Sequence, residues 1–174
     1  SMESHSEGID AFSTRRAVRE FTPEPVTEDQ LHTILNAAMH APSACNQQPW
    51  HFIVVDQRET LDAIAGVHPY AQMLLQAPLA VIVCADVTLE TCPGHWVSDC
   101  SAAMENLLVA ARAVGLGSVW VAIYPSEQRL KSIRELMRLP SFIMPLGLAA
   151  IGHAAAPLPQ VDRFNPARIH RNAW

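Results

Sequence analysis

The sequence predicts an α+β fold built as one domain over residues 1–174. Three observations predict it: short apolar runs typical of strands, a long helix that is apolar around most of its circumference, and no repeat, linker or change of composition that would separate two domains. Hydrophobic residues make up 49% and charged residues 17% of the chain, against a usual charged share of roughly 25%. This composition excludes a disordered chain and indicates an apolar interface with another subunit.

Helices and strands alternate along the first half of the chain. Residues 8–16 predict a short helix, and residues 1–8 are expected to be disordered or derived from an expression tag. Thr27 precedes Gln30 by three residues, the spacing of a capping box, so a helix is expected to begin there and to end before Pro42. The elements expected next are a strand, two short helical pieces and an apolar strand, at residues 51–55, 57–76 and 79–86.

The second half contains the strongest helical pattern of the chain. Residues 96–114 carry a broad apolar stripe, which indicates a helix buried on several sides, and Gly115 and Gly117 are expected to end it. Ser126 is expected to cap a later helix that runs to about Met137. The remaining elements are two strands and a proline-rich C-terminal arm, at residues 118–124, 146–152 and 154–174.

Charge and cysteine content exclude several classes of protein. The net charge of −5 argues against non-specific binding of nucleic acid. Prolines and glycines interrupt the longest uncharged stretch, 139–161, so it does not predict a transmembrane helix. Residues 1–15 lack the apolar core of a signal peptide, and four scattered cysteines do not suit a disulfide-stabilised secreted fold. We therefore expect a cytoplasmic protein with reduced thiols that binds neither nucleic acid nor membrane.

The histidines and cysteines give weak signals for chemistry. The spacing of Cys92, His95 and Cys100 is compatible with zinc, but no fourth ligand lies nearby and Cys100 falls on the apolar stripe of the long helix. A buried thiol and a surface histidine are expected there, and no metal site. His153, just after the last strand, is interpreted as a structural histidine.

Three arginines, Arg15, Arg16 and Arg19, lie within five residues of each other in an otherwise acidic chain. Like charges this close repel, so an anion between them would stabilise the arrangement. Guanidinium groups bind phosphate oxygens two at a time, which lysine does not do. On spacing alone, a solvated basic helix end is the simpler interpretation and an anion site is the alternative.

The segment from Pro42 to Trp50 places a hydroxyl and three amides between two prolines. Amides both donate and accept hydrogen bonds, which suits the edge of a planar heterocycle, and prolines reduce the ordering cost of binding. Taken alone, the segment is more simply a connection between a helix and a strand. The segment Gly115-Leu116-Gly117 follows a helix and precedes a strand, the reverse of the order in a dinucleotide-binding fingerprint, so a Rossmann fold is excluded.

Four longer motifs follow one another along the chain. They are RRAVREF, APSACNQQPWHFIVV, DCSAAMENLLVAARAVGLGSVWVAIYP, and PLGLAAIGHAAAP followed by VDRFNPARIHRNAW. Together and in this order they resemble the nitroreductase family, the FMN-dependent NAD(P)H oxidoreductases, from about residue 9 onward. The first resembles the family's opening motif, the second its flavin loop and following strand, the third its central helix and flavin-edge strand, and the last its final strand and C-terminal arm.

The resemblance implies an α/β/α sandwich in which helices flank a mostly antiparallel sheet. It also implies a homodimer with FMN at the subunit interface, with the helix at 96–114 central to the dimer and the C-terminal arm crossing to the partner. The cofactor-binding residues implied by it are Arg15, Arg16, Ala17, Arg19, Pro42, Ser43, Ala44, Asn46, Gln48, Ala122, Ile123 and Arg163.

These residues take their expected roles from the same resemblance. Arg15, Arg16 and Ala17 match the segment that holds the phosphate and ribityl chain of FMN, and Arg163 matches a phosphate-binding arginine of the arm. Arg19 matches the residue at the N1/O2 edge of the flavin ring, where a guanidinium stabilises negative charge on the reduced ring.

The loop at residues 42–48 matches the one that the partner subunit lays against the ring, and the backbone of Ala122 and Ile123 matches the segment beside flavin N5. No catalytic acid or base is implied, because the flavin itself transfers the hydride. The chain departs from the family pattern in four places. Ala17 replaces a serine, Ala154 replaces a proline, and Tyr70 and Met73 replace an asparagine and a lysine of longer members.

The resemblance therefore predicts an oxidoreductase that transfers hydride from NADH or NADPH through FMN to a small nitroaromatic or quinone acceptor, with ping-pong kinetics at one ring face. Two alternatives remain open. The same fold could carry a different flavin reaction, such as dehalogenation, dehydrogenation or flavin destruction, or the chain could be a non-enzymatic flavin-binding module.

Overall fold

Two strands that are buried on both faces form the centre of the fold. In the computed structural model, which describes residues 2–174, β2 (Leu79–Asp86) pairs with β4 (Ile143–Gly152). Two further strands, β1 (Trp50–Val55) and β3 (Gly117–Ala122), lie outside them, giving the strand order β1-β2-β4-β3. All three ladders are antiparallel, so the predicted mostly antiparallel sheet is confirmed.

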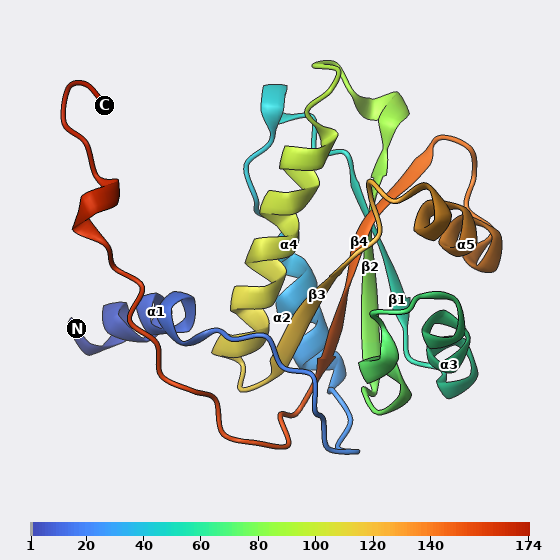
Figure 1. Ribbon diagram of the computed structural model, residues 1–174, viewed down its shortest axis with the longest axis horizontal. Coiled ribbons are helices and arrows are strands. Elements are labelled where there is room, and N and C mark those ends of the chain that lie inside the picture. Colours follow the sequence, from blue (N-terminus) through green and yellow to red (C-terminus); the bar gives the residue numbers. More distant parts are fainter. Residues whose placement is uncertain (1) are drawn as a thin grey trace.

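Helices cover both faces of this sheet, as the predicted sandwich requires (Figure 1). The helices α2 (Glu28–Met39) and α4 (Trp96–Ala113) pack on one face. The helices α3 (Arg58–Val67) and α5 (Glu127–Met137) pack on the other face. The predicted pair of helical pieces between the first two strands is confirmed as α3 and a short 3-10 turn, Gln72–Leu75.

The side chains of β2 alternate between the two cores. Val81 and Val83 point to the core with α4, whereas Ala80 and Ile82 point to the core with α3 and α5. All four are fully buried. Because both faces are covered, the strand reads as a continuous apolar run rather than as alternating apolar and polar residues.

The predicted helix boundaries rest on local caps that the structure contains. The Thr27 hydroxyl accepts a hydrogen bond from the Gln30 amide, and the Gln30 side chain accepts one from the Thr27 amide, which completes the capping box of α2. The Ser126 hydroxyl caps α5. Gly115 follows the end of α4 with φ +84°, a left-handed conformation that glycine adopts without strain.

Three boundaries differ from the sequence-based expectation. The first helix, α1, spans Met2–Thr14, so it begins before residue 8 and includes residues 2–8, which were expected to be disordered or derived from a tag. β4 begins at Ile143, because its first residues extend the ladder as far as Asp86. β3 ends at Ala122 rather than at residue 124, because the next two amides both donate to the Leu146 carbonyl and one-to-one pairing stops there.

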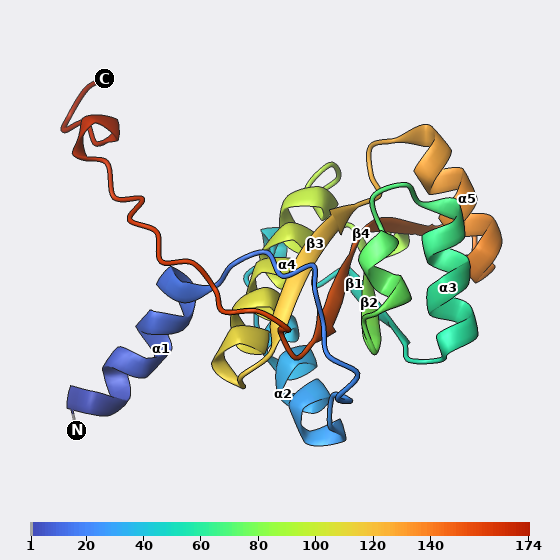
Figure 2. The same cartoon turned by 60° about the horizontal axis from the view of Figure 1, so that its bottom comes forward.

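The C-terminal arm, residues 154–174, leaves the end of β4 and extends away from the sheet on the side where α1 projects (Figures 1 and 2). Its start is fixed by two backbone hydrogen bonds, from the Thr22 amide to the His153 carbonyl and from the Ala155 amide to the Glu20 carbonyl. Several apolar side chains of the arm are exposed, among them Phe164 at 76% and Trp174 at 100%. Among the described residues, no helix is long and apolar enough to cross a membrane.

Two free thiols make the stability of this fold depend on alkaline pH. Cys84 and Cys100 are fully buried. Burial raises the pKa of each thiol from 9.0 to about 12, and the Asp99 carboxylate adds to the rise at Cys100. Between these two pH values the unfolded chain releases thiol protons that the folded chain keeps. The contribution of the buried thiols to the free energy of unfolding is therefore fully present below pH 9 and is lost as the pH rises above it.

We predict that the free energy of unfolding in urea falls by about 1.4 kcal/mol per thiol for each pH unit above the unfolded pKa. The Cys84→Ala/Cys100→Ala double variant keeps every other titrating group and should lose this part of the slope. Identical slopes for the two proteins between pH 8 and pH 10, on either side of the pKa of 9.0 of a free thiol, would contradict the assignment of the slope to the buried thiols.

Candidate functional site

The segment that carries the three N-terminal arginines lies along the free edge of β3. Ala17 forms a bridge with Ser118, and the Val18 amide donates to the Ser118 carbonyl at 2.9 Å. Gly117 makes this close approach possible, because a Cβ at that position would lie 2.8 Å from the Val18 side chain. The edge contact places Arg15 and Arg16 before the bridge and Arg19 after it.

Arg16 fastens the C-terminal arm to the end of α1. Its Nε donates to the Pro159 carbonyl at 3.0 Å, and its Nη2 reaches the Val161 carbonyl at 3.5 Å. Arg15 Nε lies 4.0 Å from a carboxylate oxygen of Glu105 on α4. The arm therefore passes directly beside the arginine pair, and Arg163 follows two residues beyond the contact at Val161.

An open groove borders the free edge of β3 and has a volume of about 610 Å³, within the range of small-ligand sites. We call it the β3 groove. Side chains from four segments line it, among them Arg19, Glu20, Tyr70, Met73, Ala122 and Arg129. The groove thus brings together Arg19, the residues Tyr70 and Met73 that depart from the family pattern, and the end of the strand predicted to border the flavin.

The two residues at the end of β3 have different environments. Ala122 is exposed and lines the β3 groove. Ile123 is fully buried, and its amide donates to the Leu146 carbonyl at 3.1 Å. Within one chain, then, Ala122 faces the groove and Ile123 presents no free amide to it.

A buried histidine, His68, holds this end of the groove together and was not identified from the sequence. Its Nδ1 accepts a hydrogen bond from the Tyr70 amide at 3.1 Å. This assignment leaves the proton on Nε2, which donates to the Ala122 carbonyl at 2.7 Å. The ring is 1% exposed. It joins positions 54 residues apart in sequence, so no local pattern could have predicted the contact.

The loop at residues 42–48 is held by a buried carboxylate on α4. One oxygen of Asp99 accepts from the Ala44 amide at 2.8 Å, and the other accepts from Gln47 Nε2 at 2.6 Å. Asp99 is 4% exposed. Asp99 and Gln47 were not among the predicted site residues, although a carboxylate on the apolar side of a helix is a signal for a buried hydrogen bond.

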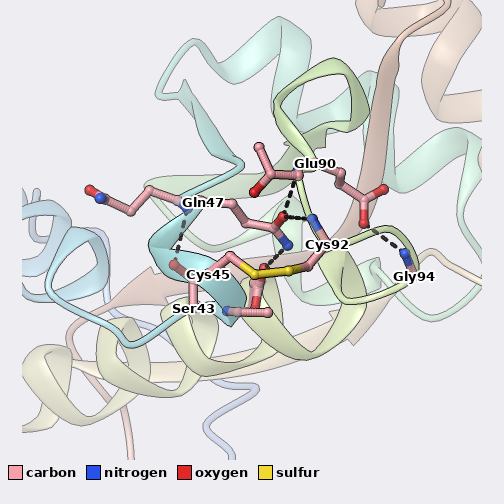
Figure 3. The surroundings of a disulfide bond; sticks show 10 residues. Ser43, Cys45, Gln47, Glu90, Cys92 and Gly94 are labelled. Atoms are coloured by element: carbon pink, nitrogen blue, oxygen red, sulfur yellow. Dashed lines mark hydrogen bonds between the residues drawn. A yellow bond between two sulfur atoms is a disulfide. The ribbon is translucent and has the colours of Figure 1, made fainter.

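The same loop is joined to residues 90–94 (Figure 3). The Gln47 side-chain carbonyl accepts hydrogen bonds from the amides of Thr91 and Cys92, each at 3.0 Å. Next to it, Cys45 and Cys92 form a disulfide with a Cα–Cα distance of 6.3 Å. The expectation of reduced thiols throughout was therefore wrong for this pair, because folding brings together two cysteines 47 residues apart. Cys84 and Cys100 are free thiols.

The polar side chains of the 42–48 loop largely bond within the loop. The Ser43 hydroxyl accepts from the Gln48 amide at 3.0 Å, and Gln48 Nε2 donates to Asn46 Oδ1 at 3.0 Å. Cys45, Asn46 and Gln48 have φ values of 52°, 51° and 46°. Non-glycine residues seldom adopt this left-handed conformation, and it clusters at functional sites. The loop that follows Pro42 is therefore a built structure and not a plain connection.

Within one chain, the 42–48 loop and the segment that carries the N-terminal arginines contact different parts of α4 (Figure 1). The loop bonds to Asp99 in the first turn, and the end of α1 bonds to Arg112 in the last turn, where Arg112 Nε donates to the Thr14 hydroxyl. Thirteen residues of helix, about 20 Å, separate Asp99 from Arg112, and Arg15 approaches Glu105 between them. In the described part of the chain, no hydrogen bond or ion pair joins the loop to these arginines.

The remaining candidates have structural roles. Cys100 is a buried thiol and His95 is exposed, as expected, while Cys92 is bonded to Cys45. In the described part of the chain, no three histidine, cysteine or acidic side chains gather as a metal site would require. His153 Nδ1 lies 3.7 Å from Glu24, which supports its structural interpretation.

The geometry of Asp99 gives a test of how the loop is held. Asp99→Asn replaces one carboxylate oxygen by an NH2 group. This donor would then face another donor, either the Ala44 amide or Gln47 Nε2. Rotating the Gln47 amide would move the conflict to Thr91 and Cys92. We predict a loss of about 1–3 kcal/mol in the free energy of unfolding and faster protease cleavage within the loop. Asp62→Asn, at an exposed ion pair with Arg58, should cost less than about 1 kcal/mol, and equal costs would contradict this role.

Comparison with known proteins agrees with this architecture. The model of the family described as "Nitroreductase family" matches residues 12–88 and 67–153. The chain is 45% identical over 166 residues to the "Putative NADH dehydrogenase/NAD(P)H nitroreductase" of Methanothermobacter thermautotrophicus, covering 95% of this chain and 87% of that protein. It is 30% identical over 172 residues to the "FMN reductase [NAD(P)H]" of Bacillus subtilis, covering 86% and 67%.

Among solved structures, the FMN-dependent nitroreductase of Clostridium difficile superposes with a TM-score of 0.88 at 27% identity, covering 95% of this chain and 99% of that one. The sandwich, the order of the motifs and these matches lead to one conclusion. The chain belongs to the nitroreductase family.

Proposed function

We propose that the chain is an FMN-dependent oxidoreductase that takes hydride from NADH or NADPH and reduces a small nitroaromatic or quinone acceptor by ping-pong kinetics. Relatives named as NAD(P)H nitroreductase and FMN reductase support the cofactor and the hydride donor. The observation that carries the proposal is the β3 groove, which places Arg19 beside the exposed end of β3.

The residues of the groove fit the ring of FMN. Among the described residues, no carboxylate lies within ion-pair distance of Arg19, so its charge is available to a ligand. In the proposed complex, Arg19 stabilises negative charge at the pyrimidine edge of the ring. Met73 supplies apolar contact, and the backbone of Ala122 borders the ring. When bound, FMN supplies the hydride transfer chemistry, which no side chain of the groove provides.

The phosphate of FMN fits the place where the two ends of the chain meet. Arg16 holds the C-terminal arm beside Arg15 through its carbonyl contacts. In the proposed complex, Arg15 and Arg163 bind phosphate oxygens, because guanidinium groups pair with them at short charge-assisted distances. Arg16 keeps the arm in place and adds positive charge. The Ala17 backbone, fixed by its bridge to Ser118 on β3, would contact the ribityl chain.

A second copy of the chain supplies the 42–48 loop. Within its own chain, this loop bonds to Asp99 in the first turn of α4, and no hydrogen bond among the described residues joins it to Arg15, Arg16 or Arg19. In a twofold dimer, each loop would lie against the ring held by the other subunit. The exposed apolar residues of the arm, such as Phe164 and Trp174, would be covered when the arm crosses to the partner. Pro42, Ser43, Ala44, Asn46 and Gln48 then act on the partner's flavin.

We also propose that the protein works in the cytoplasm, where reduced nicotinamide cofactors are its hydride donors. Thiol reductants in that compartment act on exposed disulfides. The Cys45–Cys92 bond is open to such reductants, because Cys45 is exposed.

The phosphate assignment predicts that the purified protein shows the absorption spectrum of bound FMN and that Arg163→Ala weakens FMN binding about tenfold or more, the cost of one charge-assisted contact. Arg163 is exposed, so the melting temperature of the apoprotein should not change. Arg171→Ala is the matched control, because it removes the same charge from the same exposed arm.

Equal weakening by both variants would contradict a specific phosphate contact. A wild-type protein that does not bind FMN would overturn the cofactor, and one that binds FMN without oxidising NADH or NADPH would favour another flavin reaction or a non-enzymatic module.

The shared site predicts complementation between two defective subunits. Arg19→Ala and Asn46→Ala should each impair FMN-dependent NADH oxidation as homodimers. Mixed dimers, purified through a different affinity tag on each variant, should recover about half of the wild-type activity, because one of their two sites has both residues intact. A site contained in one chain would give no recovery.

A further inference from the structure

A cation and an aromatic ring form a pair at the wall of the β3 groove that the proposed flavin contacts do not use. The Arg129 guanidinium carbon lies 4.9 Å from the centroid of the Tyr70 ring. Arg129 Nη1 reaches the Ala122 carbonyl at 3.5 Å, a long hydrogen bond. The Tyr70 side chain is 66% exposed. Both residues line the groove that contains Arg19.

Hydrogen bonds fix the backbone of both Tyr70 and Arg129. The Tyr70 amide bonds to the buried His68, whose other nitrogen donates to the Ala122 carbonyl. Arg129 lies in the first turn of α5, and its amide donates to the Ser126 hydroxyl that caps the helix. A ligand that contacts the pair would therefore meet side chains whose backbones are already fixed, which lowers the ordering cost of binding.

The charge of Arg129 has no carboxylate partner in the part of the chain that the structure describes. The helix does not explain its position either, because a cation in the first turn is unfavourable to the helix dipole. The groove contains two guanidinium groups, of Arg19 and Arg129, and one carboxylate, of Glu20. It is locally positive in a chain with a net charge of −5.

We infer that Tyr70 and Arg129 form a binding site for the carboxylate of an aromatic acceptor, so that the enzyme prefers anionic aromatic substrates to neutral ones. The exposed ring of Tyr70 contacts the aromatic part of the substrate, and the fork of Arg129 pairs with both carboxylate oxygens. This inference rests on the proposed function, because it assigns the class of acceptor that the flavin site reduces. Arg19 remains with the cofactor in this arrangement.

Two acceptors of nearly equal shape test the inference. Para-nitrobenzoate carries a carboxylate, and para-nitrobenzamide carries a neutral amide in the same place. The wild-type protein should bind the benzoate about tenfold more tightly in calorimetry. With NADH as donor, it should show a correspondingly lower KM for the benzoate. Arg129→Gln should remove this preference, raising the Kd and KM for the benzoate about tenfold while leaving those for the benzamide within twofold.

Lys131→Gln is the matched control, because it removes one positive charge from the same helix at an exposed position. It should leave the preference unchanged. Tyr70→Leu should weaken binding of both compounds to a similar degree, since the ring contact does not depend on the carboxylate.

Each other result overturns the inference. If Arg129→Gln impairs both acceptors equally, or releases FMN, the residue maintains the groove and does not select its substrate. If it raises the KM for NADPH but not for NADH or for the benzoate, the guanidinium binds the additional phosphate of NADPH. Calorimetry separates this inference from the proposed function, because benzoate binding is measured without turnover. Loss of all NADH oxidation with retained, Arg129-dependent benzoate binding would overturn only the proposed function.

Discussion

The burial of β2 and β4 on both faces is the constraint on which the rest of the structure depends. A strand covered on both sides has no room for charged side chains, because burying an unpaired charge costs far more than any packing contact returns. The charged groups are therefore on the helices, at the strand ends, in the loops and at the free edge of β3, and the buried carboxylate of Asp99 is hydrogen-bonded. The open edge leaves backbone groups available for pairing, and the segment beginning at Arg15 pairs there. The exclusion of charged side chains from the two central strands thus leaves the edge of β3 and the loops as the places where the candidate site can form.

The two halves of the candidate site are built in different ways. Around the β3 groove, the backbone of one strand end is joined to a distant segment through His68. At the other end of α4, a loop with three left-handed residues is stabilised by Asp99, by Gln47 and by the Cys45–Cys92 disulfide. Such conformations persist when surrounding contacts over-determine them. Each half is therefore held in place by contacts within its own chain.

Much of the fold could be predicted from local patterns, because each pattern reflects an interaction between residues that are close in sequence. The capping box at Thr27 and Gln30 specifies where α2 begins, and the apolar circumference of residues 96–113 requires a helix covered by neighbours. The β3 boundary was less predictable, since the two amides after Ala122 share one acceptor on another strand. The predicted arginines and loop residues follow from motif order, and their contacts to FMN stay predictions.

The sequence by itself determined the element order, the apolar strands, the helix caps and the position of the arginines along the chain, because each depends on neighbours within a few residues. Only the tertiary structure decided that Cys45 meets Cys92, that His68 reaches Ala122, and that the 42–48 loop bonds to Asp99 of α4. These contacts join residues about fifty positions apart. Their free energy comes from the packing of whole elements, which no short pattern in the sequence records.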